Sequence, residues 1–150
     1  MTLDSTSQKT NFLYSIKKHV VDNIATFEGI YTMFDKFLPP DKNLDKWISV
    51  MPGALNRNTV SDFSVDIYCV TRKDYEGENL AALLDLVTGY FSGNLTETDS
   101  LKRVPFYSAA TGQQNGCMVI IDCIESDTME APDQSKFVIL SITAKMASKI

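Results

Sequence analysis

The stretch Asp62-Phe63-Ser64-Val65-Asp66-Ile67-Tyr68-Cys69-Val70-Thr71-Arg72 alternates between apolar and polar side chains. Successive side chains of a strand point to opposite faces, so this pattern predicts a strand with one buried face. Phe63, Val65, Ile67 and Cys69 form the buried face, while Ser64, Asp66, Tyr68 and Arg72 form the other. The rest of the chain must therefore supply elements that cover the apolar face.

Two helices are predicted on either side of this strand. The first covers about residues 7–27, where apolar side chains recur at helical spacing and Gly29 can end the helix: Phe12, Ile16, Val20, Ile24 and Phe27. The second covers about residues 75–91, with Asp74 as a plausible N-cap and one apolar stripe: Leu80, Leu83, Leu84, Val87 and Phe91. Both helices have an apolar face to bury.

Further strands are predicted before and after the second helix. The expected strands are a short one within 30–38, one at 47–51 ended by Pro52-Gly53, one at 102–108 and two at 117–124 and 136–146. Pro105 places the strand at 102–108 at a sheet edge, because proline cannot donate to a ladder. Exposed connections are expected at 52–61, 109–116 and 125–135, the last being acidic.

This order of elements predicts the fold class. Strands that follow one another with short connections favour a mainly antiparallel sheet, here covered by two helices in an α+β two-layer domain. The length of 150 residues fits one domain over 1–150, with a flexible N-terminus at 1–6.

Bulk properties exclude several classes of protein. No stretch approaches the roughly 18 apolar residues of a membrane span, and the start of the chain does not resemble a signal peptide. The net charge of −5 gives no positive field to attract nucleic acid. Cys117 and Cys123 would lie roughly 20 Å apart in one strand, too far for a disulfide. Free, buried thiols fit synthesis in a reducing cytoplasm.

Residues for catalysis or cofactor binding are not evident in the sequence. His19 is the only histidine, which excludes a metal site built from several histidines of one chain. There is no phosphate-binding glycine pattern, and Cys69 lies on an apolar face without a base nearby in sequence. The acidic residues at 125–133 lack the spacing of a calcium-binding loop. We expect no enzyme activity, no catalytic residue, no cofactor and no metal, and therefore a function in binding other proteins.

Two alternatives remain open. One is a cytoplasmic protein-binding module. The other is a small enzyme in which folding brings together Asp62, Asp66 and Glu125; it requires a deep pocket with converging carboxylates.

The element order resembles the tail terminator (tail completion) proteins of long-tailed bacteriophages and the related small neck proteins. The resemblance covers nearly the whole chain and rests on the opening helix Phe12 to Phe27, the strand Trp47 to Gly53 with the loop after it, the strand Val65 to Arg72, the helix Leu80 to Phe91 and the closing strands at 117–124 and 137–146. It rests on this order alone, because the family has no signature motif.

The resemblance implies a structural role in the virion tail or neck. Such proteins form a ring, commonly a hexamer, on the last ring of tail tube protein, stop tail polymerisation and present a surface to the head-tail connector protein. A head-to-tail adaptor or stopper is the alternative within the neck proteins. DNA can pass through such a ring without specific binding. The candidate interface residues are Trp47, Arg57, Asn58, Gln113, Asp127 and Glu130.

Overall fold

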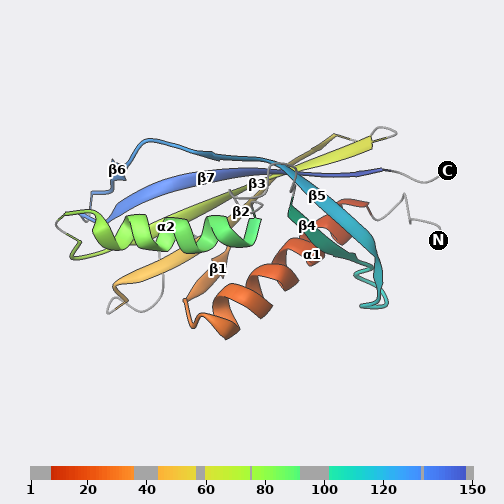
Figure 1. The fold of residues 1–150 in the computed structure, drawn as a ribbon, viewed down its shortest axis with the longest axis horizontal. Coiled ribbons are helices and arrows are strands. Elements are labelled where there is room, and N and C mark those ends of the chain that lie inside the picture. Colours follow the sequence, from red (N-terminus) through yellow and green to blue (C-terminus); the bar gives the residue numbers. More distant parts are fainter. Residues whose placement is uncertain are drawn as a thin grey trace.

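The computed structural model of the chain describes residues 8–35, 44–56, 60–74, 76–91, 102–132 and 134–147. In chain order its elements are the helix α1 (Gln8–Val20), the π-helix η2 (Val21–Phe27), the strands β1 (Thr32–Phe34), β2 (Lys46–Asn56) and β3 (Val60–Thr71), the helix α2 (Glu78–Phe91), and the strands β4 (Lys102–Tyr107), β5 (Gln114–Glu125), β6 (Met129–Glu130) and β7 (Lys136–Ala147) (Figure 1). The predicted mixture of helices and strands is confirmed.

The strands form one curled sheet in the order β1-β2-β3-β7-β5-β4, and β6 pairs with the start of β7 (Figure 1). All these pairs are antiparallel except β1 with β2, which is parallel. In the centre of the sheet Val65 pairs with Ile142 and Ile67 with Leu140. The alternation in 62–72 therefore correctly predicted a strand and the face that it buries.

The main core lies between this face of the sheet and the two helices. Phe12 of α1 is fully buried, with its ring centroid 5.6 Å from that of Phe63 and 5.0 Å from that of Phe106. The α2 stripe packs in the same cluster, which includes Leu80, Leu83, Leu84, Val87 and Phe91. Both helices thus cover the apolar face that the sequence pattern identified.

Strand β2 corrects the predicted exposed connection at 52–61. It continues through Pro52-Gly53 to Asn56, with a shift of register between Pro52 and Leu55. A Cβ atom at Gly53 would lie 2.7 Å from the backbone oxygen of Ser64, so glycine permits the close approach of β2 to β3. Pro52 lies beyond the end of β1, where β2 is an edge strand and a missing N–H is tolerated.

Two other predicted connections are shorter than expected. Strand β5 begins at Gln114, within the loop predicted at 109–116, and β6 lies within the predicted connection 125–135. Residues Gly116 and Met129–Glu130 are thus part of the sheet.

Strand β4 forms an edge of the sheet, as Pro105 indicated, and α1 lies against its end. The backbone N–H of Tyr107 donates to Ser15 Oγ at 2.7 Å, and the N–H of Ala109 donates to Asn11 Oδ1 at 3.0 Å. Both polar side chains of α1 are buried. Helix α1 therefore satisfies backbone donors that the end of this edge strand would otherwise leave open.

Asp74 anchors the start of α2, which begins at Glu78 rather than at 75. The buried carboxylate accepts hydrogen bonds from the N–H groups of Gly77, Asn79 and Leu80, the last at 2.8 Å, and from the Thr71 hydroxyl. Burial raises the pKa of this carboxyl, but the hydrogen bonds outweigh burial and hold the pKa below its usual value.

We expect Asp74→Ala to lower the free energy of unfolding by about 1–2 kcal/mol at pH 7, because several donors lose their acceptor. A carboxyl group whose pKa is lower in the folded than in the unfolded state stabilises the fold at pH values above its unfolded-state pKa. This stabilisation is lost as the pH falls through the folded-state pKa. The difference in melting temperature between wild type and variant should therefore shrink below a pH of about 4. Thermal unfolding at neutral and acidic pH measures it, with the exposed Asp85→Ala as control; an equal difference at both pH values would contradict the assignment.

Candidate protein interface

Of the six candidate interface residues, those that the structure describes differ in how exposed they are. Trp47 is fully buried, packs with Met33 and Val70, and lies 4.7 Å below the Arg72 guanidinium. Trp47 is therefore a core residue on the second face of the sheet, without the exposed side chain that an interface contact requires. Arg57 and Asn58 lie outside the described residues.

Gln113, Asp127 and Glu130 are exposed, as an interface requires. Gln113 precedes β5 and Asp127 follows it, so the length of this strand separates the two loops. Glu130 lies in β6, three residues after Asp127. The structure therefore does not bring all three together in one patch.

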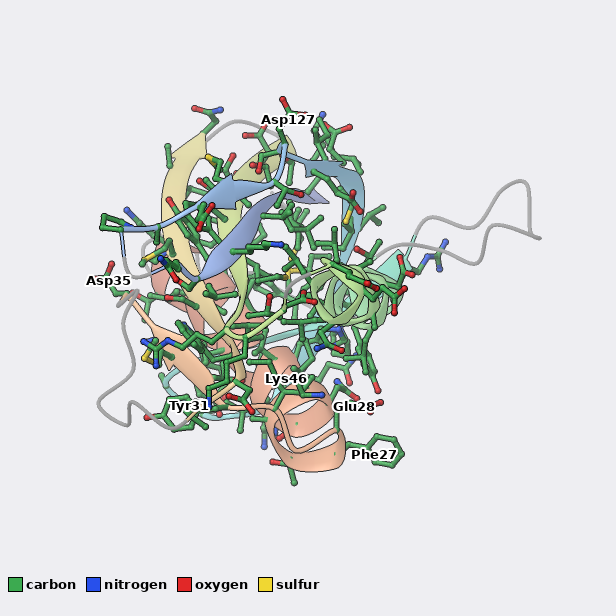
Figure 2. The ribbon with its side chains drawn as sticks, turned by 90° about the vertical axis from the view of Figure 1, so that its left-hand side faces the viewer. Phe27, Glu28, Tyr31, Asp35, Lys46 and Asp127 are labelled. Carbon is green, nitrogen blue, oxygen red and sulfur yellow. The ribbon has the colours of Figure 1, made fainter. Side chains whose placement is uncertain are left out.

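The most exposed large apolar side chain among the described residues is Phe27, the last residue of η2. Its side chain is 80% exposed and projects from the body of the protein (Figure 2). The sequence placed Phe27 in the buried helical stripe, which is wrong. The backbone N–H of Glu28 donates to Asn23 O, five residues back, so the segment winds less per residue than an α-helix and turns Phe27 outward.

Hydrogen bonds fix the backbone that carries Phe27. The hydroxyl of Tyr90, near the end of α2, donates to Glu28 Oε1 at 2.6 Å, and this bond raises the pKa of Tyr90. His19 Nε2 lies 2.8 Å from Tyr90 O, and the Asn23 amide donates to His19 O at 2.9 Å. The single histidine therefore has a structural role, linking η2 to α2.

A groove borders the segment that carries Phe27. It consists of two adjoining hollows, of about 330 and 660 Å³, which share Ile30, Asp45 and Lys46. Tyr31, which is 39% exposed, lies at its rim. We call Phe27, Tyr31 and this groove the Phe27 face.

A second exposed apolar side chain, Ile124, lies on the side of the sheet opposite to the helices and Phe27. Ile124 is 62% exposed and pairs with Ser141, whose hydroxyl donates to Asp66 Oδ1 at 2.9 Å. These side chains belong to the face that the helices do not cover, since the neighbouring Cys123 pairs with the buried Ile142. We call Ile124 with Ser141 and Asp66 the Ile124 face.

The cysteines do not provide a nucleophile in the core. Burial raises the pKa of Cys69 to about 12 and that of Cys123 to about 11, and the negative charge of Glu125 acts in the same direction. A thiol with such a pKa is almost entirely protonated at neutral pH. All three cysteines are free, and Cys117 is the exposed one.

The three carboxylates of the enzyme alternative do not converge. Asp62 pairs with Lys145 and Asp66 with Ser141 on the uncovered face, whereas Glu125 pairs with the buried Leu140. Asp62 accepts a hydrogen bond from the Asn56 amide at 2.9 Å. Within the described ranges, no group of three or more His, Cys, Asp or Glu residues is arranged to hold a metal ion.

Comparisons with known proteins bear on the fold alone. No family model and no curated protein matches the chain. Seven chains of solved structures match it, and one of them, a protein of unstated function, aligns with a TM-score of 0.55 at 9% sequence identity. That alignment covers 89% of this chain and 94% of the other. None of the helices in the described part of the chain has the length and hydropathy to cross a membrane.

Proposed function

We propose that the chain is a virion structural protein that resembles a tail terminator: it forms a homo-oligomeric ring that caps the tail tube, stops tail polymerisation and joins the tail to the head connector. The proposal includes the two-layer arrangement of sheet and helices, a place in the tail or neck of the virion and no enzyme activity. DNA passes through the ring without specific binding. The role in the virion is proposed from the resemblance in element order, and the ring is proposed from the exposed apolar side chains on the surface.

The proposal of a ring rests on the positions of Phe27 and Ile124, two exposed apolar side chains on opposite sides of the sheet. A ring requires a head-to-tail interface, in which each subunit uses two different faces. Exposed apolar side chains on two opposite faces meet this requirement, whereas a two-fold dimer needs only one self-complementary patch. In the proposed ring the Phe27 face of one subunit contacts the Ile124 face of the next.

Phe27 is suited to such a contact because its backbone is already fixed. Aromatic side chains are frequent among the residues that dominate binding energy at interfaces. The Tyr90–Glu28 hydrogen bond holds the end of η2 in place, so little backbone freedom is lost on docking. The neighbouring groove offers space for side chains of the next subunit.

Light scattering of the purified chain across concentration, alone and with tail tube subunits, tests the proposal. We expect a closed ring, commonly of six subunits in the family it resembles, or a cap that halts growth of the tube. Electron microscopy of tube lengths supplies the second readout. A persistent monomer without effect on tube length would overturn the proposal, whereas a ring that binds only the head connector would favour an adaptor.

A further inference from the structure

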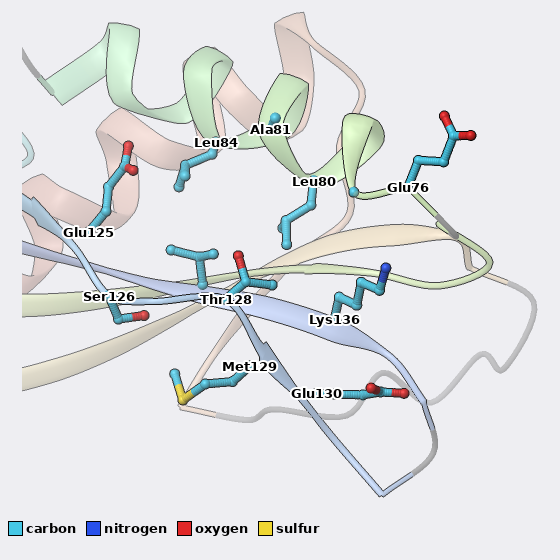
Figure 3. Close-up of a pocket in the computed structure, with 12 residues that line it drawn as sticks. Glu76, Leu80, Ala81, Leu84, Glu125, Ser126, Thr128, Met129, Glu130 and Lys136 are labelled. Carbon is cyan, nitrogen blue, oxygen red and sulfur yellow. The ribbon is translucent and has the colours of Figure 1, made fainter.

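A second groove, of about 450 Å³, lies between the start of α2 and the connection from β5 to β7 (Figure 3). Leu80 and Leu84 project into it from α2 (Figure 3). Val138 of β7 also lines the groove and adds to its apolar surface. Ser126 and Thr128 contribute polar groups along one wall. The groove thus has an apolar floor beneath a polar rim, which is the usual arrangement of a ligand site.

Both walls of this groove are held by hydrogen bonds. Asp74 fixes the start of α2 through the N–H of Leu80 at 2.8 Å. On the other wall, the N–H of Ser126 donates to Ile139 O, and the N–H of Ile139 donates to Ser126 Oγ, both at 2.9 Å. Because the walls of the groove are already ordered, less of the binding free energy is spent on ordering them when a ligand binds.

The rim is predominantly acidic. Glu76, Glu125 and Glu130 line the groove, against one amine from Lys136. Lys136 lies toward the Glu76 and Glu130 end, while the Glu125 carboxylate lies at the other end and points toward α2 (Figure 3). No hydrogen bond or ion pair of Glu125 occurs among the described residues. The Glu125 end therefore favours a cationic group.

We propose that this groove binds a segment of a partner protein that places an aliphatic side chain over Leu80 and Leu84 and a Lys or Arg beside Glu125. The charge of the rim selects the cation, and the leucine floor selects the aliphatic side chain. The groove is lined along one wall by the chain from Ser126 to Glu130, which suits an extended peptide rather than a compact ligand. This site is separate from the Phe27 face and does not depend on ring formation.

A titration followed by amide chemical shifts tests the site. The probe is a blocked pentapeptide with one leucine and one lysine separated by glycines, compared with the same peptide carrying glutamate in place of lysine. We expect the lysine peptide to shift the amides of Ala81, Leu84 and Thr128, and the glutamate peptide to leave them unchanged. Equal effects of both peptides, or shifts confined to other surfaces, would overturn the proposal.

Two variants separate a specific site from weak general binding. Glu125→Gln should weaken binding of the lysine peptide about threefold, the usual scale of a solvent-exposed ion pair. The matched control is Glu78→Gln, which changes an exposed carboxylate at the start of α2 outside the groove. Ala81→Trp, at an exposed position on the groove wall, should abolish binding while circular dichroism remains that of the wild type. Unchanged affinity in Glu125→Gln and Ala81→Trp would contradict the assignment, whatever the oligomeric state.

Discussion

We expect Phe27→Asp to convert the proposed ring to monomers in light scattering, with affinity between subunits reduced at least about thirtyfold. Truncation of a central aromatic contact commonly costs about 2 kcal/mol or more, and a buried carboxylate adds a desolvation cost. The fold should be unaffected, since the Phe27 side chain is 80% exposed in the single chain. Thr26→Asp is the matched control, because Thr26 is the exposed neighbour in η2. An undiminished ring in Phe27→Asp would remove the Phe27 face from the interface.

The same interface makes a sharper prediction for mixtures of variants. Ile124→Asp alone should also give monomers, because it damages the second face. A mixture of Phe27→Asp and Ile124→Asp subunits contains one intact copy of each face, so it should give heterodimers but no ring. A two-fold interface would not produce this result. Native mass spectrometry distinguishes the species, and a mixture that stays monomeric would contradict the head-to-tail geometry.

Replacing Phe12 by Ala should lower the free energy of unfolding by about 3–5 kcal/mol, the usual cost of removing a buried aromatic ring. Phe12 is fully buried and joins α1 to the central strand β3 through Phe63 and to the edge strand β4 through Phe106. The cavity lies where three elements meet, so it cannot close by moving one of them. Urea denaturation measures the loss, and Thr10→Ala, exposed on the same helix, should change stability by less than about 0.5 kcal/mol. A loss below about 1 kcal/mol in Phe12→Ala would mean that α1 packs elsewhere.

The elements that are periodic in sequence could be predicted because burial repeats with the geometry of the backbone. The inward side chains of β3 follow period two, and those of α2 follow the helical period, so the sequence predicts the buried faces of both elements correctly. The continuation of β2 past Pro52 was missed because it depends on contact between Gly53 and Ser64, residues of different strands. Local sequence signals a turn there, and the tertiary contact overrides it.

The candidate interface was harder to predict because exposure is a property of the finished surface. Phe27 continues the apolar spacing of Ile16, Val20 and Ile24, and no local pattern predicts the π-helix that turns it outward. Trp47 is a candidate interface residue in the sequence, but the folded chain buries it, and Arg72, far along the chain, lies over its ring. Aromatic residue type alone does not distinguish a binding residue from a core residue.

The contact between α1 and β4 has a consequence for behaviour at high concentration. Another strand could add to the end of β4 only if Tyr107 and Ala109 first released Ser15 and Asn11. That release would pull Phe12 and Ile16 of the same helix out of the core. Amyloid-like stacking or strand exchange at this edge is therefore opposed by the stability of the whole domain.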